Sequence, residues 1–494
     1  MTDKPLPLSP RGAEAPAESS ADAAGEVDPI DRRDFLRVAG IGAGAILATG
    51  CAPAVATFAP ARGIAPARTS RGNGHTVVIG GGAWGGWTSL HLRRRGVRVT
   101  MIDAYGPGNS KASSGAETRG IRSSYGDRAS AGELWTSWAR TAIQRWSDFD
   151  DEFAKEFHTK FFHRTGDVIC RVKPEPFVTR TIELWKALGV KHEVIDGAEV
   201  MKRWPVIDAH DIEIAVTEPD AGVARARAAT QAVASIAQRE GVRLVIGRAR
   251  PGPIVNGVMD GVVLEDGTVI RGDSYVFCCG PWLRKMFPSI LENRMRIPLG
   301  FVCYFGVPEG DRRFSYPNLP SYNFPGVTGW PALPVDLRGF RVRGAIAPPP
   351  PRDGSPEAMA AAERASDAST IDLAQTDPDT SSRWMSQTRV DGSRRFVQAR
   401  FPLLADAPLV ETRSCHYESS VNRDFIIDHL PGMTNAWIAG VGQAEGFKFG
   451  PVVGDYIAQR VLGYPGDPAM AAAFKFPTAE YEVPKVPGKE ENFF

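Results

Sequence analysis

A cluster of glycines has the spacing of a phosphate-binding turn. Gly80, Gly82 and Gly85 form the pattern G-x-G-x-x-G within VVIGGGAWGG. In such a turn the first glycine permits a tight bend, the second lets the backbone approach a pyrophosphate, and the third lets a helix pack closely on a strand. Asp103 follows about twenty residues later, where an acidic side chain can accept hydrogen bonds from an adenosine ribose. The pattern predicts a dinucleotide site but does not distinguish NAD from FAD.

The loop after Asp103 combines small residues with two arginines. The segment Ser113–Gly115, with Ser114 at its centre, has small side chains that would let the backbone run close to a flat ring. Arg119 and Arg122 are three positions apart, so in a helical turn both would point to one side. Guanidinium groups can bind a carboxylate through two parallel hydrogen bonds. Taken alone, the two arginines are better explained as solvated surface residues.

The hydrophobic pattern predicts the elements that must position these residues. Apolar runs at 76–79 and 97–102 flank a helical segment at 84–95 and are typical of buried parallel strands. A further apolar run at 273–280 is expected to return the chain to the same sheet. Alternating apolar and polar residues at 295–344 predict antiparallel strands. The sequence therefore predicts an α/β protein whose Rossmann-like nucleotide-binding domain is interleaved with a substrate domain built on an antiparallel or mixed sheet.

The expected organisation alternates between these two domains. It consists of a disordered segment with an export signal (1–56), a linker (57–73), three nucleotide-binding segments (74–150, 211–290 and 413–470), two substrate-domain segments (151–210 and 291–412, with an insertion near 348–380), and a C-terminal tail (471–494).

The composition is that of an ordinary globular protein. Of the 494 residues, 43% are hydrophobic and 23% are charged, and the formal net charge is +1. This balance gives no strong positive field of the kind that attracts nucleic acid. The spacing of the six cysteines matches neither a zinc site nor a regular disulfide framework, so no metal site is predicted.

The first residues have the features of an export signal. The pair Arg32-Arg33 precedes a moderately apolar run rich in glycine and alanine, which resembles a twin-arginine signal read by the Tat export machinery. The run is too short and too rich in glycine to span a membrane. Ala54–Ala56 fits a cleavage site, and the expected location is the periplasm. Two alternatives to this cleaved signal remain. Cys51 would be the acylation site of a lipoprotein, or the arginine pair would be accidental in a cytosolic protein.

Four motifs together resemble the FAD-dependent D-amino-acid-oxidase superfamily, most closely its sarcosine oxidase and N-methyl amino acid oxidase branch. The motifs are VVIGGGAWGG with Asp103, SSGAETRGIRSSYG, SCHY with FIIDHLPG, and GFKFGPVVG, within residues 74–465. The resemblance implies that the dinucleotide is FAD. It also implies an FAD-binding domain interrupted by a substrate domain whose mixed sheet covers the flavin.

The resemblance assigns substrate-side roles residue by residue. Lys448 and Arg122 match the pair that holds the substrate carboxylate in that branch. Two cations facing a partly dehydrated pocket bind a carboxylate strongly and fix the reacting C–H bond over the flavin. Tyr417 matches a substrate-pocket tyrosine, and Arg119 matches a residue beside the flavin.

Cys415 in SCHY falls where monomeric relatives attach the flavin 8-methyl group through a thioether. A thiolate must attack that carbon, and a cationic neighbour such as Arg413 would favour the thiolate. A buried, unreactive thiol is the alternative. Gly446 and Phe447 of the GFKF motif are further expected cofactor contacts.

Two positions depart from the branch. Arg341 occupies the place of a lysine that assists oxygen activation near flavin N5, and it keeps the charge but not the ammonium geometry. Glu445 replaces a histidine just before GFKF, where an acid would pair either with a cationic substrate group or with an arginine. Both changes leave the electron acceptor and the substrate side chain open.

These inferences predict an exported, FAD-dependent oxidoreductase that acts on the C–N bond of an amino acid or N-alkyl amino acid. Hydride passes to flavin N5, water hydrolyses the imine, and O2 becomes H2O2. Two alternatives remain: a dehydrogenase that passes electrons to another acceptor, and a flavin-bearing protein that binds a carboxylate without catalysis.

Overall fold

The computed structural model describes residues 74–128, 131–334, 338–347 and 376–481. Several expectations fall outside the described residues: the disordered start with its export signal, Cys51, the linker at 57–73, most of the insertion near 348–380, and the end of the C-terminal tail.

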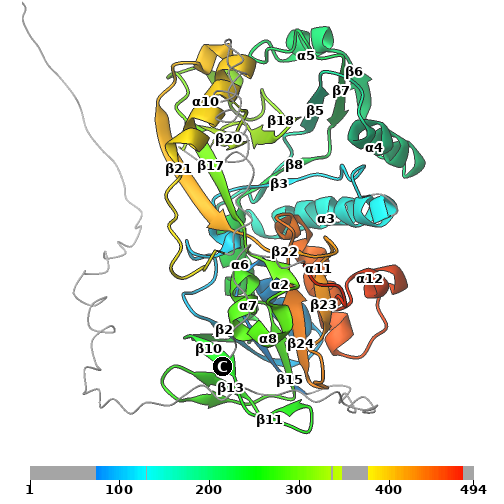
Figure 1. The fold of residues 1–494 in the computed structure, drawn as a ribbon, viewed down its shortest axis with the longest axis vertical. Coiled ribbons are helices and arrows are strands. Elements are labelled where there is room, and N and C mark those ends of the chain that lie inside the picture. The colour runs from blue at the N-terminus through cyan, green and yellow to red at the C-terminus, as the bar shows by residue number, and fades with distance from the viewer. Residues whose placement is uncertain (1–73, 129–130, 335–337, 348–375, 482–494) are drawn as a thin grey trace, which may run out of the picture. The chain divides into compact units, whose positions relative to one another are not determined.

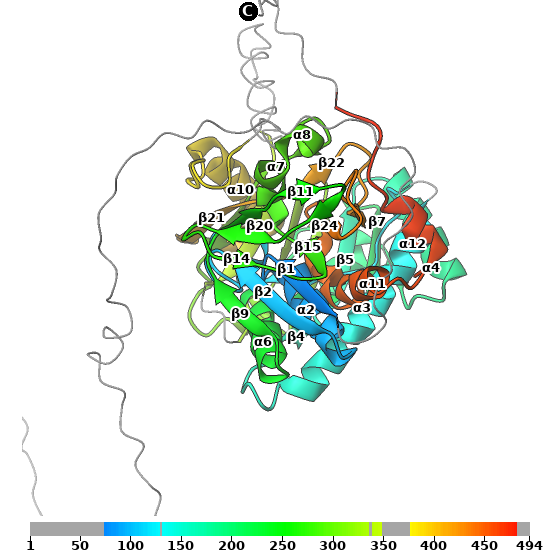
Figure 2. The same cartoon turned by 90° about the horizontal axis from the view of Figure 1, so that it is seen from below.

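A six-stranded, mostly parallel sheet forms the nucleotide-binding part of the fold (Figures 1 and 2). Its strand order is β23-β24-β15-β1-β2-β9, and only β23 runs antiparallel to its neighbour. The strands are β1 (His75–Ile79), β2 (Arg98–Asp103), β9 (Arg243–Ile246), β15 (Ser274–Phe277), β23 (Ile426–His429) and β24 (Ala436–Gly440). The chain enters this sheet from three separate segments.

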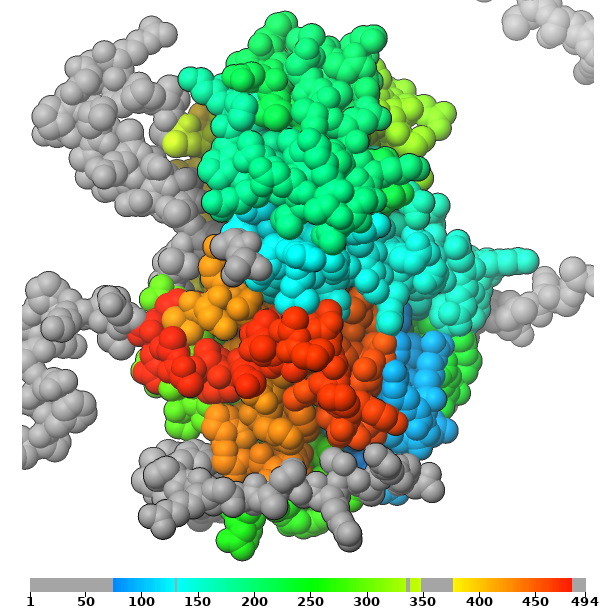
Figure 3. Space-filling view, turned by 90° about the vertical axis from the view of Figure 1, so that its right-hand side faces the viewer, coloured from blue at the N-terminus to red at the C-terminus, as the bar shows by residue number. Residues whose placement is uncertain are grey.

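The two faces of this sheet are covered by different apolar cores, because neighbouring residues of a strand point to opposite sides. Val78 of β1 packs with helices of one face, whereas Val77 and Ile79 pack with elements of the other. Those elements are β13 (Val262–Leu264), β14 (Val269–Ile270), α7 (Leu283–Met286) and α8 (Pro288–Leu291). The helices of the first face are α2 (Ala83–Arg94), α3 (Gly132–Phe153), α6 (Ala226–Arg239) and α11 (Gly450–Val461). In Figure 3 the late-chain α11 lies against the early-chain α3, so distant parts of the sequence close this core together.

An eight-stranded mixed sheet forms the second part (Figure 1). Its order is β21-β17-β20-β19-β18-β5-β7-β6, and β18 and β5 are its parallel pair. The strands are β5 (Asp167–Arg171), β6 (Glu193–Ile195), β7 (Ile214–Glu218), β17 (Leu299–Phe305), β18 (Ser321–Phe324), β19 (Val327–Trp330), β20 (Phe340–Gly344) and β21 (Leu409–His416). Together the two sheets confirm the predicted α/β fold class.

One face of the eight-stranded sheet is apolar, and the other is polar in part, with a smaller apolar cluster at Ile169 and Val216. Tyr322, Phe340 and Val342 pack in one apolar cluster with Phe396 of helix α10 (Gln387–Arg400). The centre of the Tyr322 ring lies 5.5 Å from that of Phe340 and 5.9 Å from that of Phe396. Residues that alternate with them along the strands face the other way. This alternation leaves one side of the sheet free to line a site.

Smaller elements connect the two large sheets. They are β3 (Arg119–Ile121), β4 (Phe162–His163), β8 (Gly222–Ala224), β10 (Ala249–Pro251), β11 (Ile254–Val255), β12 (Val258–Met259), β13 (Val262–Leu264), β14 (Val269–Ile270), β16 (Met295–Arg296), β22 (Ser419–Ser420), α4 (Pro176–Ala187), α5 (Gly197–Arg203), α7 (Leu283–Met286), α8 (Pro288–Leu291) and α12 (Pro468–Ala473). None of the described helices is both long and apolar enough to cross a membrane.

Strand pairing departs from two expected domain boundaries. β7 lies after the predicted boundary at 210, yet it pairs with β5 and β6 in the eight-stranded sheet. β21 continues past the predicted boundary at 412 to His416 and pairs along β17. Both strands are fixed by partners that are distant in sequence, so a local pattern gives no sign of which sheet they join.

Candidate active site

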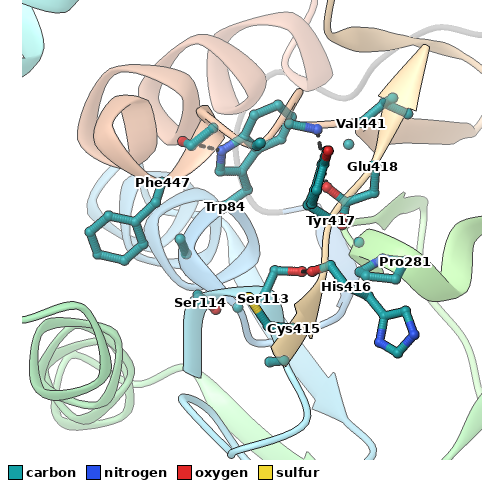
Figure 4. Close-up of a pocket in the computed structure, with 18 of the residues that line it drawn as sticks. Trp84, Ser113, Ser114, Pro281, Cys415, His416, Tyr417, Glu418, Val441 and Phe447 are labelled. Carbon is teal, nitrogen blue, oxygen red and sulfur yellow. Dashed lines mark hydrogen bonds between the residues drawn. The ribbon is translucent and has the colours of Figure 1, made fainter. Parts of the chain in front are cut away.

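A cavity of about 1190 Å³ lies between the glycine turn and the polar side of the eight-stranded sheet. Figure 4 shows part of its wall, with Trp84 and the serines of one domain facing Cys415 to Glu418 of β21 and the loop after it. Every residue predicted for the site lines this cavity except Gly85. The structure therefore brings the early arginines and the late lysine to one place.

The glycine turn has the close packing that the motif requires. Gly80 has φ +101°, and a Cβ there would lie 2.3 Å from the carbonyl oxygen of Cys278. A Cβ on Gly85 would lie 1.7 Å from the carbonyl oxygen of Gly80, so Gly85 holds the helix against the turn and does not itself reach the cavity. Gly82 is the N-cap of α2 and has no side-chain cap, which leaves the N–H groups of the first turn available to an anion.

Asp103 closes the same turn from the end of β2. Its carboxylate accepts a hydrogen bond from the Gly81 N–H at 2.7 Å and one from the Tyr105 N–H at 2.9 Å. An ionised carboxylate has about four lone-pair sites, so it retains acceptors for a ribose hydroxyl. The glycine cradle, the uncapped helix and this acid fit the adenosine diphosphate part of FAD.

Cys415 lies on β21 at the border between the two domains. Figure 4 places it beside Ser113 and Ser114, and its sulfur accepts a hydrogen bond of 3.8 Å from the Arg119 guanidinium. The expected helper Arg413 instead donates to the carbonyl oxygens of Ser110 and Gly115. The cation that contacts the thiol is therefore Arg119.

Arg119 and Arg122 do not share a helical turn, so that expectation was wrong. Arg119 begins strand β3, which pairs antiparallel with β8, and Arg122 follows the end of that strand. Both side chains still line the cavity. Pairing with β8 overrides the local pattern because it satisfies the backbone hydrogen bonds of this segment.

Lys448 is a buried ammonium group, with a side chain only 8% exposed. Its Nζ donates to the hydroxyl of Tyr125 at 2.8 Å and lies 3.5 Å from a carboxylate oxygen of Glu445. Burial, with the nearby positive charge of Arg122, lowers the pKa of Lys448 to about 8, while Glu445 opposes the shift. The charges of Lys448 and Arg122 therefore interact within one cavity, which is compatible with both cations binding one carboxylate.

Arg122 forms an ion pair with a buried acid, Asp167. Its Nη1 lies 3.7 Å from Oδ1 of Asp167, and both oxygens of that carboxyl lack a hydrogen-bond partner among the described residues. Burial raises the pKa of Asp167, while Arg122 and Lys448 oppose the shift. Glu218 is its cross-strand neighbour, and burial raises the pKa of Glu218 to about 7 although Ser123 donates to it. Two buried acids, Asp167 and Glu218, therefore lie near the cations Arg122 and Lys448.

Glu445 pairs with protein cations. Arg128 approaches one of its oxygens at 3.4 Å, and Lys448 approaches the other at 3.5 Å. Burial alone would raise the pKa of Glu445, but these two cations hold it below its usual range. Glu445 was expected to pair either with a cationic substrate group or with an arginine, and the structure shows it beside Arg128.

Arg341 is buried on the polar side of the eight-stranded sheet, with 3% of its surface exposed. Its guanidinium carbon lies 3.5 Å from the centre of the Trp330 ring. Burial, reinforced by Arg119 and Arg343, lowers its pKa to about 9, so it stays charged at neutral pH. Tyr417 also lines the cavity and packs beside Gly300.

The remaining predicted cofactor contacts come from the GFKF segment. Trp84 of α2 donates to the carbonyl oxygen of Gly446 at 2.8 Å, and Phe447 stacks on Trp146 with ring centres 5.3 Å apart. The Trp84 contact joins the last motif to the glycine-turn helix α2 (Figure 4), and the Trp146 contact joins it to α3.

Sequence reasoning missed several residues of the site. Tyr125 contacts Lys448, Asp167 contacts Arg122, and Arg343 lines the cavity two residues after Arg341. Tyr125 stands inside a quoted motif, and an acid in a buried apolar strand was a usable signal for Asp167. Among the described residues no group of three or more His, Cys, Asp and Glu side chains could hold a metal ion.

A Rossmann-like sheet with a pyrophosphate-type turn, joined to a mixed sheet across one shared cavity, defines a dinucleotide-dependent oxidoreductase architecture. The chain belongs to the family described as FAD dependent oxidoreductase (DAO), whose model matches residues 75–460.

Known proteins that resemble the chain agree with this family. It is 26% identical over 389 residues to N-methyl-L-tryptophan oxidase of Citrobacter koseri, covering 78% of this chain and 94% of that enzyme. It is 26% identical over 394 residues to monomeric sarcosine oxidase of Bacillus sp., covering 78% and 91%. The predicted family and its sarcosine oxidase branch are confirmed, and so is the prediction of an FAD-dependent oxidoreductase.

Solved structures support the fold. Fructosamine oxidase (Amadoriase II) from Aspergillus fumigatus superposes with a TM-score of 0.66 at 21% identity, covering 82% of this chain and 89% of the other. L-Proline dehydrogenase from P. horikoshii superposes with a TM-score of 0.62 at 19% identity, covering 79% and 93%.

Proposed function

We propose that the protein oxidises the C–N bond of an amino acid or N-alkyl amino acid. The observation that carries the proposal is the pair of cations, Lys448 and Arg122, lining the same cavity as the glycine turn. Relatives that are named for oxidising N-methyl-L-tryptophan and sarcosine, both N-methyl amino acids, agree with such a substrate. In the overall reaction the substrate loses a hydride and a proton to become an imine, which water hydrolyses, and O2 takes up the two electrons to give H2O2.

The chain's own residues bind and orient the substrate. Lys448 and Arg122 hold its carboxylate, Tyr125 fixes the ammonium of Lys448, and Asp167 fixes the guanidinium of Arg122. FAD, when bound, supplies the hydride acceptor at its N5 atom. Holding the carboxylate at two points limits the orientations of the adjacent C–N bond, which is the contribution of these residues to catalysis.

Anaerobic mixing of the purified holoenzyme with a panel of N-methyl and primary amino acids tests the proposal. Loss of the flavin absorbance with at least one member is the expected result. If every member leaves the flavin oxidised, the substrate class is wrong. A perturbed but unreduced spectrum would point to the carboxylate-binding protein without catalysis.

A dehydrogenase is a second candidate because Arg341 is a guanidinium that lies against Trp330, where a lysine was expected from the branch. Such an enzyme would pass its electrons to an acceptor other than O2. Peroxide formed mole for mole with substrate consumed, at the same rate, would eliminate it.

Affinity for carboxylates is expected to fall as pH rises through about 8, because the pKa of Lys448 is about 8 and only the ammonium form binds the anion. Glu445 raises that pKa, so Glu445→Gln should move the decline to lower pH. The measurement is the dissociation constant of acetate against pH, followed by the flavin spectrum. Glu213→Gln, at an exposed acid, is the matched control and should leave the profile in place. A shift to higher pH would contradict the assignment.

We also propose that the protein is exported in folded form by the twin-arginine route, which suits an enzyme loaded with its cofactor in the cytoplasm. The support is the sequence Arg32-Arg33 followed by an apolar run, and the lipoprotein alternative at Cys51 stays open. Changing both arginines to lysine should leave the protein in the cytoplasmic fraction of its host, whereas unchanged periplasmic recovery would contradict the route. Incorporation of labelled palmitate, lost in Cys51→Ser, would identify the lipoprotein.

A further inference from the structure

Strand β20 directs two arginines into the cavity. Phe340 and Val342 are fully buried in the apolar core behind the sheet, so the alternating residues Arg341 and Arg343 face the opposite way. Their cross-strand partners on β19, Trp330 and Thr328, line the same cavity. Strand pairing therefore fixes the positions of these two guanidinium groups.

The hydrogen-bonding capacity of these arginines is largely unused. Arg341 is only 3% exposed, and its Nε and Nη1 atoms are buried without a hydrogen-bond partner. Arg343 forms no ion pair with any carboxylate of the described residues, and its nearest charged neighbours include Arg119 and Arg122. Burial lowers the pKa of Arg343, as it does that of Arg341. Buried donors that lack acceptors are costly, which makes an anion beside this pair favourable. The Arg343 side chain is half-buried and lines the cavity, so it is the member of the pair that a ligand can reach directly.

Several acids around this part of the cavity already have cationic partners. Asp167 pairs with Arg122, Glu175 with Arg171, Asp127 with Arg423, and Glu445 with Arg128 and Lys448. Arg119 is bonded to the carbonyl oxygen of Thr118 and to the sulfur of Cys415. Arg341 and Arg343 therefore belong, with the neighbouring Arg119, to the cavity arginines that have no carboxylate partner among the described residues.

We propose that Arg341 and Arg343 form a second anion subsite, so that the preferred substrate is an amino acid or N-alkyl amino acid that carries a second carboxylate. This proposal rests on the proposed function, because the first carboxylate occupies Lys448 and Arg122. The guanidinium fork matches a carboxylate in two parallel hydrogen bonds, which gives the subsite its chemistry. A single-carboxylate amino acid would leave Arg343 without an anionic partner.

Matched ligand pairs test the subsite in the holoenzyme. N-Methyl-L-aspartate and N-methyl-L-asparagine have nearly the same shape and differ by one negative charge, and N-methyl-L-glutamate and N-methyl-L-glutamine extend the pair by one carbon. The expected result is a dissociation constant roughly 10- to 100-fold lower for the acid of at least one pair, the range typical of a charged hydrogen bond. Binding is followed anaerobically by calorimetry, with the flavin spectrum recorded in parallel.

Substitution of Arg343→Gln should remove the preference for the acid and leave binding of the amide within about twofold, since the amide does not use the charge. Arg343→Lys should restore part of the preference. Arg180→Gln, on the exposed surface of α4, controls for the loss of one positive charge. Arg341→Gln is a second variant at the more deeply buried member of the pair.

Three results would overturn the subsite: equal affinities within both ligand pairs, equal weakening of acid and amide by Arg343→Gln, or loss of bound flavin as the main effect of that variant. The last result would assign the arginines to the cofactor. The dissociation constants of succinate and glutarate, compared with that of butyrate, test the subsite independently of the proposed function. These ligands have no amine, so they can bind but cannot be oxidised. A preference for the dicarboxylates without flavin reduction by any amino acid would keep the subsite and reject the reaction.

Discussion

Replacing Lys448 by methionine is expected to lower kcat/KM roughly 30- to 5000-fold. Truncating one partner of a buried, hydrogen-bonded charge pair costs about 2–5 kcal/mol, and 1.36 kcal/mol is a factor of ten. The ammonium is buried and donates to Tyr125, so no solvent cation can replace it. Arg122 alone would then hold the carboxylate, in a cavity where Asp167 already draws on its charge. Steady-state kinetics with the best substrate of the amino acid panel provides the measurement.

The folded state of this variant can be separated from its affinity. Methionine fills a similar apolar volume, and Glu445 keeps Arg128 as a partner after the lysine is lost. Flavin content and thermal stability should therefore change little. Lys186→Met, at an exposed position of α4, is the matched control. Unchanged kcat/KM, or a loss confined to flavin content, would remove Lys448 from the carboxylate site.

The parts of the fold that the sequence predicts are those with local causes. The glycine spacing requires close backbone approach, and the structure has it at Gly80 and Gly85. The turn at 265–268, with its Asp-Gly pair, joins β13 to β14, and Gly267 adopts φ +86° there. The apolar run ending at Cys278 becomes β15, which pairs in parallel with β1. Each of these features depends on a few neighbouring residues.

The parts that sequence reasoning misplaced depend on distant partners. β7 contains an apolar run that fits either domain, and its pairing with β5 decides its sheet. Arg119 enters a strand because β8 supplies its hydrogen bonds. The unpaired state of Arg341 is likewise visible only once the neighbouring acids are seen to be paired with other cations. The candidate residues were predictable by resemblance, but their electrostatic balance was not.

We propose that FAD is attached covalently to Cys415. The position of this thiol makes the proposal testable by the flavin colour that stays on the denatured chain. The thiol lines the cavity on β21, where the Arg119 guanidinium donates to its sulfur. A cation so close favours the thiolate, which is the form able to attack the flavin 8-methyl carbon.

Thioether formation would replace one C–H bond of the flavin 8-methyl group by a C–S bond to this sulfur. The two electrons released would pass to the flavin ring, when FAD is bound, and then to O2, and the two protons would pass to solvent. After denaturation and filtration, the yellow colour should stay with the wild-type chain and pass through the filter in Cys415→Ser.

A second cysteine of the same cavity provides the control for this experiment. Cys279 also lines the cavity, but its thiol donates toward the carbonyl oxygen of Ile79, and burial raises its pKa well above the usual value. Cys279→Ser should therefore keep the colour on the chain. Colour released from the wild-type protein would leave Cys415 as an unreactive thiol beside Arg119. Colour retained in Cys415→Ser would require a different attachment residue, because serine cannot supply the thiolate that the reaction needs.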